Sequence, residues 1–138
     1  MKISKLIAAM LLPCASMAMA APAKYIITDH STAPWMDQAT AEGIWLKTQS
    51  AKLVKLYPAK KWGFLSQVEG GMDASKTCVI TARTLMLPVS GKELLFKPAK
   101  SATTFGHLAN ASIEQCKALA ATKLDEAVQA LGSALVPN

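Results

Sequence analysis

Apolar residues recur along the chain with spacings that change from one region to the next, and each spacing predicts a different element. Over residues 35–57, one helical stripe carries apolar side chains at positions 39, 46, 53 and 57. Positions 42–43 and 49–50 interrupt this stripe, while Ile44, Trp45 and Val54 widen it. Ser31 or Thr32 before position 34 is typical of a helix start, and Pro58 ends the pattern. We therefore predict one helix over residues 35–57.

From residue 61 the pattern changes to β-rich runs separated by turn residues, which predict an antiparallel meander. Its three strands cover residues 62–69, 77–87 and 93–97, with turns at 70–75 and 90–92. Alternation in the middle strand divides its residues into one face with Cys78, Ile80, Ala82, Thr84 and Met86 and a second face with Val79, Thr81, Arg83, Leu85 and Leu87. Pro88 is expected to end this strand, and segment 99–111, which is polar and small, is expected to be a loop.

The last third of the chain has the clearest helical pattern. Ser112 and Gln115 have the spacing of a capping box, in which each side chain accepts a hydrogen bond from an otherwise unpaired backbone N–H. Apolar residues then follow mostly at three- and four-residue intervals on one face: Ile113, Cys116, Ala120, Leu124, Ala127, Val128, Leu131 and Leu135. This pattern predicts a helix with one continuous apolar side.

Residues 1–20 have the pattern of a secretory signal peptide. Lys2 and Lys5 precede an apolar stretch over positions 6–12, and Ala18-Met19-Ala20 supplies a small-residue cleavage site. The apolar stretch is shorter than the roughly 20 residues that a membrane-spanning helix needs. We expect cleavage after Ala20, a single domain over residues 21–138 with no transmembrane segment, and a periplasmic or secreted location. Lipidation of Cys14 is the alternative, because residues 11–14 loosely resemble a lipobox.

Cleavage would leave two cysteines, Cys78 and Cys116. An even number of cysteines outside the cytoplasm predicts a disulfide, whereas a redox-active pair usually has the Cys-x-x-Cys spacing. A Cys78–Cys116 bond would place the C-terminal helix over the sheet face that carries Ile80. The order helix, three strands, helix then predicts a small two-layer α+β domain in which the C-terminal helix packs on the sheet and one disulfide ties the two together.

Charge and composition exclude several classes of function. Removal of residues 1–20 leaves 13 basic and 9 acidic residues, a formal charge of +4. Nucleic-acid binding needs a more concentrated basic surface with interleaved aromatic residues, so we predict no nucleic-acid partner. The methionines outside the signal, Met36, Met72 and Met86, are too scattered for a soft-metal motif, so we predict no metal and no cofactor.

The candidate catalytic residues are sparse. His30 and His107 are the only histidines, and His107 with Asp29 is a pair that could act together in catalysis. No nucleophile elbow, metal-binding histidine pair or carboxylate pair with a fixed spacing accompanies them. We therefore predict that the protein is not an enzyme.

The second face of the middle strand carries the candidate binding residues. Val79, Leu85 and Leu87 need a cover, which either the first helix or segment 99–111 provides, or else they form an apolar patch around Arg83 that suits a partner or a second copy. This favours a small exported binding protein of the bacterial envelope that engages another protein through Arg83, Leu85 and Leu87.

A second function class stays open at this point. A pocket between helix and sheet, lined by Trp35, Trp45 and Trp62, would make the protein a periplasmic carrier of a small ligand.

Overall fold

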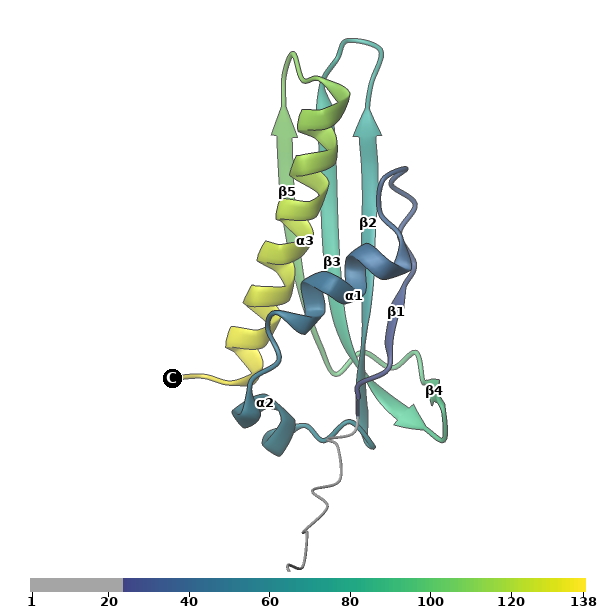
Figure 1. Ribbon diagram of the computed structural model, residues 1–138, viewed down its shortest axis with the longest axis vertical. Helices are drawn as coiled ribbons and strands as arrows, with labels where there is room; N and C mark the ends of the chain where they lie inside the picture. Colours follow the sequence, from purple (N-terminus) through teal and green to yellow (C-terminus); the bar gives the residue numbers. More distant parts are fainter. Residues whose placement is uncertain (1–23) are drawn as a thin grey trace, which may run out of the picture.

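The computed structural model describes residues 24–138, which form a sheet with helices packed on one side (Figure 1). The strands are β1 (Ile27–Asp29), β2 (Trp62–Met72), β3 (Cys78–Ser90), β4 (Glu93–Leu94) and β5 (Lys100–Leu108). The helices are α1 (Gln38–Leu46), α2 (Ala51–Leu56) and α3 (Ile113–Leu135). The predicted α+β class, with the C-terminal helix packed on the sheet, is confirmed. The predicted signal peptide and Cys14 lie outside the described residues.

The sheet differs from the predicted three-stranded meander because it has five strands. Its main order is β1-β2-β3-β5, and β4 pairs with the end of β3. β1 runs parallel to β2, while the other pairs are antiparallel. β1 was missed because it has only three residues and depends on its pairing with β2, from Ile27 with Phe64 to Asp29 with Ser66.

The prediction of a loop over residues 99–111 is wrong, because β5 occupies most of this segment. It pairs with β3 from Met86 opposite Lys100 to Cys78 opposite Leu108. Its central helix-facing residues, Ala102, Thr104 and Gly106, are small because α3 crosses closely. A Cβ on Gly106 would lie 2.6 Å from Cε of Lys123. The close approach removes the large apolar residues by which a strand is usually recognised.

Two further strand boundaries differ from the prediction. The predicted third strand over residues 93–97 reduces to the two residues of β4. β3 continues through Pro88 to Ser90 because the neighbouring backbone supplies the hydrogen bonds. The Val89 N–H donates to the Lys61 carbonyl on the side of β2, and the Pro88 carbonyl accepts from the Leu95 N–H on the other side.

The single helix predicted over residues 35–57 is two helices. Asp37 begins α1 by accepting a hydrogen bond from the Thr40 N–H at 2.8 Å, and Ser50 begins α2 by accepting from the Leu53 N–H at 3.1 Å. The break falls where the apolar stripe was interrupted. It also changes the buried side of α1, which consists of Ala41, Ile44 and Trp45 and leaves positions 39 and 46 exposed.

Residues 31 and 32, the predicted helix caps, have another role. The Ser31 hydroxyl donates to the Asp29 carboxylate at 2.6 Å and accepts from the Val68 N–H at 2.8 Å. The hydroxyl of buried Ser66 donates to the same carboxylate at 3.0 Å. These bonds hold the segment after β1 against β2.

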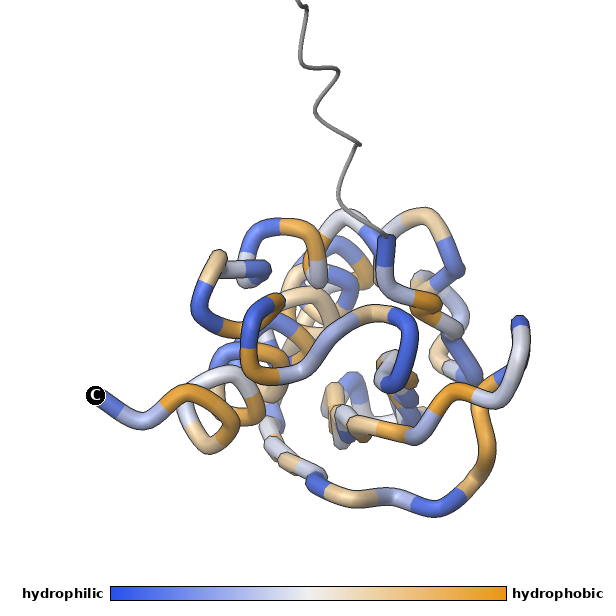
Figure 2. The backbone as a smooth tube through the Cα atoms, turned by 90° about the horizontal axis from the view of Figure 1, so that it is seen from below, coloured by the Kyte–Doolittle hydropathy of each residue, from blue (hydrophilic) through white to orange (hydrophobic). Residues whose placement is uncertain are grey.

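The main core lies between the helices and the sheet. Its β3 residues are those predicted for the disulfide side, and the predicted apolar side of α3 is buried from Cys116 to Leu135. Ile113 is the exception, with 63% of its surface exposed, because it lies in the first turn of α3 outside the contact with the sheet. Hydrophobic and hydrophilic residues alternate in short runs along the backbone in Figure 2, as the amphipathic elements require.

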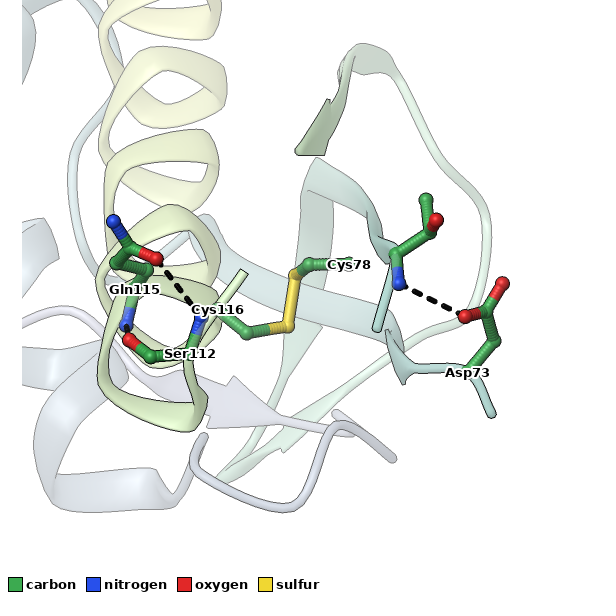
Figure 3. Close-up of a disulfide and its surroundings, with 6 residues drawn as sticks. Asp73, Cys78, Ser112, Gln115 and Cys116 are labelled. Atoms are coloured by element: carbon green, nitrogen blue, oxygen red, sulfur yellow. Dashed lines mark hydrogen bonds between the residues drawn. A yellow bond between two sulfur atoms is a disulfide. The ribbon is translucent and has the colours of Figure 1, made fainter. Parts of the chain in front are cut away.

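Two kinds of link join α3 to the sheet. The predicted Cys78–Cys116 disulfide is present, with the Cα atoms 5.5 Å apart, and the predicted capping box of Ser112 and Gln115 lies beside it (Figure 3). In addition, the hydroxyls of Thr84 and Thr104 donate to the carbonyls of Ala127 and Lys123 at 3.0 and 2.6 Å. These bonds satisfy the polar groups that the sheet presents to the helix.

Candidate functional site

The three residues predicted for a partner surface have different surroundings. Arg83 is exposed, whereas Leu85 and Leu87 expose only 3% and 1% of their surface. The two leucines form a small core cluster with Leu65 of β2, against which Leu94 of β4 packs. Of the three predicted residues, Arg83 alone is therefore accessible to a partner.

The cover of this cluster is not the one that the sequence predicted. The helices of residues 35–57 lie on the other side of the sheet, and segment 99–111 lies within the sheet as β5. The hairpin after β3 provides the cover instead, because its Leu94 reaches back over the sheet. A Cβ on Gly63 would lie 2.5 Å from Cδ2 of Leu94, so the glycine makes room for this contact.

The rest of the second sheet face is uncovered, and we call it the open face. It consists of the side chains that alternate with core residues on β2, β3 and β5: Gln67, Glu69, Val79, Thr81, Arg83, Thr103, Phe105 and His107. Register places Gln67, Arg83 and Thr103 in one row across the strands and Glu69, Thr81 and Phe105 in the next. The open face therefore combines two charges of opposite sign with an aromatic side chain.

Two features of the open face distinguish it from an ordinary polar surface. Phe105 exposes 60% of its surface, and its ring centroid lies 6.2 Å from that of His107. Within residues 24–138, the ion pair with an N–O distance below 4.0 Å joins Lys123 to Glu126. Neither Arg83 nor Glu69 therefore has a charged partner in this part of the chain. Gln67, Glu69, Thr81 and Arg83 line a small depression of about 60 Å³ on the open face. The guanidinium donors are thus available for an external acceptor.

A larger cavity lies on the same side of the sheet, next to the leucine cluster. Its volume is about 360 Å³, and Leu65, Leu87 and Leu94 contribute apolar surface. The other lining residues are Ile26, Thr28, His30, Lys92, Glu93 and Phe96. The sequence contained no signal for this cavity, because it forms where β1 and the hairpin after β3 meet over β2.

The tryptophans proposed as pocket lining lie elsewhere. Trp45 is buried and stacks on Phe64 with a centroid distance of 4.6 Å, and its Nε1 has no partner among the described residues. Trp35 and Trp62 are partly buried against the main core. None of the three lines the cavity of 360 Å³.

The structure does not bring together the histidine and carboxylate considered for catalysis. His107 belongs to β5 and Asp29 to β1, and β2 and β3 lie between these two strands. Asp29 accepts hydrogen bonds from Ser31 and Ser66, which gives it a structural role. Within residues 24–138, no three His, Cys, Asp or Glu side chains cluster in a way that would hold a metal ion.

Three shifted pKa values belong to structural groups and not to the open face. Burial raises the pKa of Tyr25, whose hydroxyl donates to the Tyr57 carbonyl. Hydrogen bonds from Thr40 lower the pKa of Asp37 at the start of α1. Hydrogen bonds from Ser75 and Thr77 lower the pKa of Asp73 in the turn between β2 and β3. That turn begins after Gly70 and Gly71, which belong to β2 and not to the predicted reversal.

None of the helices in the described part of the chain combines the length and hydrophobicity that crossing a bilayer requires. The disulfide is of the kind that forms and persists in oxidising compartments, which indicates an exported protein.

Comparison with known proteins identifies no family. No family model matches the chain, and no curated protein matches it at a significant level. Among solved structures, the chain resembles the PelC dodecamer from Paraburkholderia phytofirmans, with a TM-score of 0.40, 13% identity, and coverage of 81% of this chain and 92% of that one. A PelC variant from the same organism gives a TM-score of 0.39 and 10% identity over 81% of this chain and 91% of that one. At TM-scores below 0.5, this similarity carries no inference about assembly or function.

Proposed function

We propose that this protein is an exported, non-catalytic binding protein of the bacterial envelope and that it engages another protein through the open face. One observation supports this proposal above all: an unpaired arginine and an exposed phenylalanine lie on adjacent, hydrogen-bonded strands of the sheet. Arginine and aromatic residues are enriched among the residues that supply most of the binding energy at protein interfaces.

The geometry favours binding because the open face is already ordered. Arg83 and Phe105 lie on β3 and β5, whose backbones pair along nine positions. Side chains on a paired sheet lose less conformational freedom on binding than side chains on a loop. Glu69, on the neighbouring β2, adds a charge of opposite sign, so a partner with a mixed acidic and basic surface would fit.

Charge reversal at Arg83 tests the proposal. The tagged protein would be purified from the exported fraction after mild crosslinking, and the crosslinked partner would be quantified for the parent, Arg83→Glu and Lys47→Glu. Lys47 is exposed after α1, on the helix side of the sheet, so its reversal makes the same change in charge away from the open face. We expect Arg83→Glu to reduce the crosslinked partner about tenfold and Lys47→Glu to leave it unchanged. Equal yields from both variants would contradict the proposal.

A second candidate function, carriage of a small ligand, is favoured by the cavity of 360 Å³. The cavity lies on the second sheet face and not between helix and sheet, but its volume and apolar leucines are typical of small-molecule sites. Thr28→Phe would fill the cavity from β1, and Thr28→Val would keep the side-chain volume. Under this proposal the parent and Thr28→Val bind one equivalent of the anionic aromatic dye ANS, and Thr28→Phe does not. Binding that is absent from the parent, or that persists in Thr28→Phe, would reject this site.

A further inference from the structure

Many of the lysines of the chain lie at one end of the molecule. Residues 52–61 and 92–100 contain seven exposed lysines and one acidic residue, Glu93. The first segment includes α2 and the turn into β2, and the second runs from the hairpin after β3 to the start of β5. Both segments lie at the lower end of Figure 1. We call this surface the basic end, and its lysines are Lys52, Lys55, Lys60, Lys61, Lys92, Lys97 and Lys100.

Backbone hydrogen bonds hold the two segments of the basic end together. The Val89 N–H donates to the Lys61 carbonyl at 2.9 Å, and Lys100 begins β5 opposite Met86 of β3. α2 lies close to the start of β2, because the Pro58 carbonyl accepts a hydrogen bond from the Lys61 N–H at 2.9 Å. Since β2 and β3 separate the two segments in the sequence, the fold itself concentrates these lysines.

The charge of the basic end is not neutralised by the described part of the chain. Within residues 24–138 the ion pair below 4.0 Å joins Lys123 to Glu126, so no lysine of the basic end has a carboxylate partner there. The Lys52 ammonium donates to the Pro137 carbonyl, a neutral group that leaves its charge in place. An external anion would therefore find unpaired positive charges at this end.

The opposite end of the molecule has a balanced charge. The turn between β2 and β3 and the start of α3 form this end (Figure 1). Glu69, Asp73 and Glu114 lie there with Lys76 and Lys117. The positive charge is thus concentrated at one end of the long axis and is not a general property of the surface.

Large apolar side chains are exposed among the lysines of the basic end. Phe96 exposes 67% of its surface, Leu56 51% and Leu95 42%. Lys92 and Lys97 lie on either side of Leu95 and Phe96 in the chain. At a membrane surface, an apolar side chain enters the headgroup region, and the long lysine side chains keep their ammonium groups at the level of the phosphates.

We propose that the basic end binds the surface of a membrane that contains anionic phospholipids, with Leu95 and Phe96 inserted among the headgroups. Clusters of about four to eight basic residues are typical of segments that bind anionic lipids. The disulfide indicates an exported protein, which would meet the membranes of the envelope. Binding would be peripheral, at one end of the molecule.

The composition of the basic end favours lipid over an acidic protein. Its seven basic residues are all lysines, whereas the single arginine of the chain, Arg83, lies on the open face. Lysine is depleted at protein interfaces, and arginine is enriched. A lysine ammonium is a compact charge that needs no fixed geometry, so it suits mobile phosphate headgroups. A soluble polyanion would neutralise the lysines but would leave Leu95 and Phe96 in water.

Co-sedimentation with lipid vesicles tests the proposal. The exported protein would be mixed with vesicles of phosphatidylglycerol and phosphatidylcholine, or of phosphatidylcholine alone. Every protein carries Cys14→Ser, so that no lipid anchor contributes. We expect binding to the anionic vesicles alone, and salt should weaken it because salt screens exposed charges. Lys92→Gln combined with Lys97→Gln should lower the partition coefficient about tenfold or more, and Phe96→Ser should lower it about tenfold.

Two variants elsewhere in the chain are matched controls. Lys76→Gln combined with Lys117→Gln removes the same charge at the opposite end. The 13 residues of β3 span about 40 Å between the two ends, several Debye lengths at about 0.1 M salt. Phe105→Ser removes an aromatic side chain of similar exposure, 60%, from the open face. Both controls should stay within about threefold of the parent. Circular dichroism checks that each variant is folded.

Three outcomes would overturn the proposal. The first is a parent that does not bind anionic vesicles, and a crosslinked protein that still depends on Lys92 and Lys97 would then assign the basic end to an acidic protein. The second is an equal loss of binding in the control at Lys76 and Lys117. The third is vesicle binding that Phe96→Ser leaves unchanged, because no side chain would then insert. The partner test at Arg83 concerns the open face and is independent of all three.

Discussion

The two faces of the sheet are made by the same strands, yet different parts of the chain cover them. On the helix face, β3 presents Cys78, Ile80 and Ala82 to α3, which comes more than twenty residues after β3 ends. On the second face, the nearby hairpin covers Leu85 and Leu87, and the remaining side chains stay open to solvent. Alternation along a strand therefore separates two faces, but it does not determine how completely each face is covered.

The comparison also separates stability from binding. The helix face has the disulfide, the larger core and the hydrogen bonds from threonine hydroxyls to α3. Most of the free energy that stabilises the folded state is therefore expected to come from this face. The second face has a small core and an exposed arginine and phenylalanine. Exposed residues on a stable support are free to serve recognition because the fold does not depend on them.

The largest expected effect tests whether Leu85 belongs to a core while Arg83, on the same face of β3, does not. Leu85→Asp would bury a charge beside Leu65 and Leu87 and should lower the free energy of unfolding by about 5 kcal/mol, enough to unfold a marginal domain. Arg83→Asp, two residues earlier on the same face, should change it by less than about 0.5 kcal/mol. Urea denaturation followed by circular dichroism measures both. A folded and stable Leu85→Asp variant would show that the leucine cluster is not a core.

The disulfide tests how strongly the helix face depends on its covalent link. Replacement of Cys78 and Cys116 by alanine should lower the free energy of unfolding by about 4 kcal/mol, because the bond closes a loop with a sequence separation of 38 residues. Urea denaturation of the double variant and of the reduced parent should give similar losses. A loss below about 1 kcal/mol in both would mean that packing alone holds α3 on the sheet.

Matched truncations compare the two cores directly. Leu124→Ala, in the main core, should lower the free energy of unfolding by about 3 to 4 kcal/mol. Leu87→Ala should cost about 2 to 3 kcal/mol, because Leu87 lines the cavity of 360 Å³ and has fewer buried neighbours. Both leucines are almost fully buried, so exposure does not explain the difference. Equal losses would indicate that the two cores are packed to the same degree.

The smallest expected effect is at Asp73, in the turn between β2 and β3. Ser75 and Thr77 donate hydrogen bonds to the Asp73 carboxylate and lower its pKa below the ordinary value of about 3.9. A depressed pKa stabilises the fold above the unfolded-state pKa, and this contribution is lost as pH falls through the folded-state pKa. The urea midpoint of Asp73→Asn should therefore fall less than that of the parent between about pH 4 and pH 2. Identical pH profiles would exclude this contribution.

The elements with strong local signals were predictable. The capping box of Ser112 and the row from Cys116 to Leu135 specified α3, because its start and its buried side both depend on residues within a few turns. The disulfide followed from the count of cysteines and from compartment chemistry. The division of β3 into two faces followed from its period of two.

The elements that depend on distant partners were not predictable. β5 has small residues where α3 crosses at Gly106, so its sequence resembles a loop. Asp37 and Ser50 start two short helices in place of one, because their hydrogen bonds compete with the continuation of a weak apolar stripe. The burial of Leu85 and Leu87 depends on Leu94, whose turn back over the sheet has no local signal.

The sequence by itself determined the class of the fold, the covalent link and the residues of the helix face, because periodicity, capping and cysteine count act over short stretches of chain. Only the tertiary structure decided which part of the second face is covered and which edge of the sheet is closed. Arg83 and Leu85 lie on the same side of β3, but the hairpin after β3 covers Leu85 and does not reach Arg83. Gln38 closes the β1 edge because the fold brings it against Ile27 and Asp29, from which it is separated in the sequence. No described residue makes such a contact with the outer edge of β5.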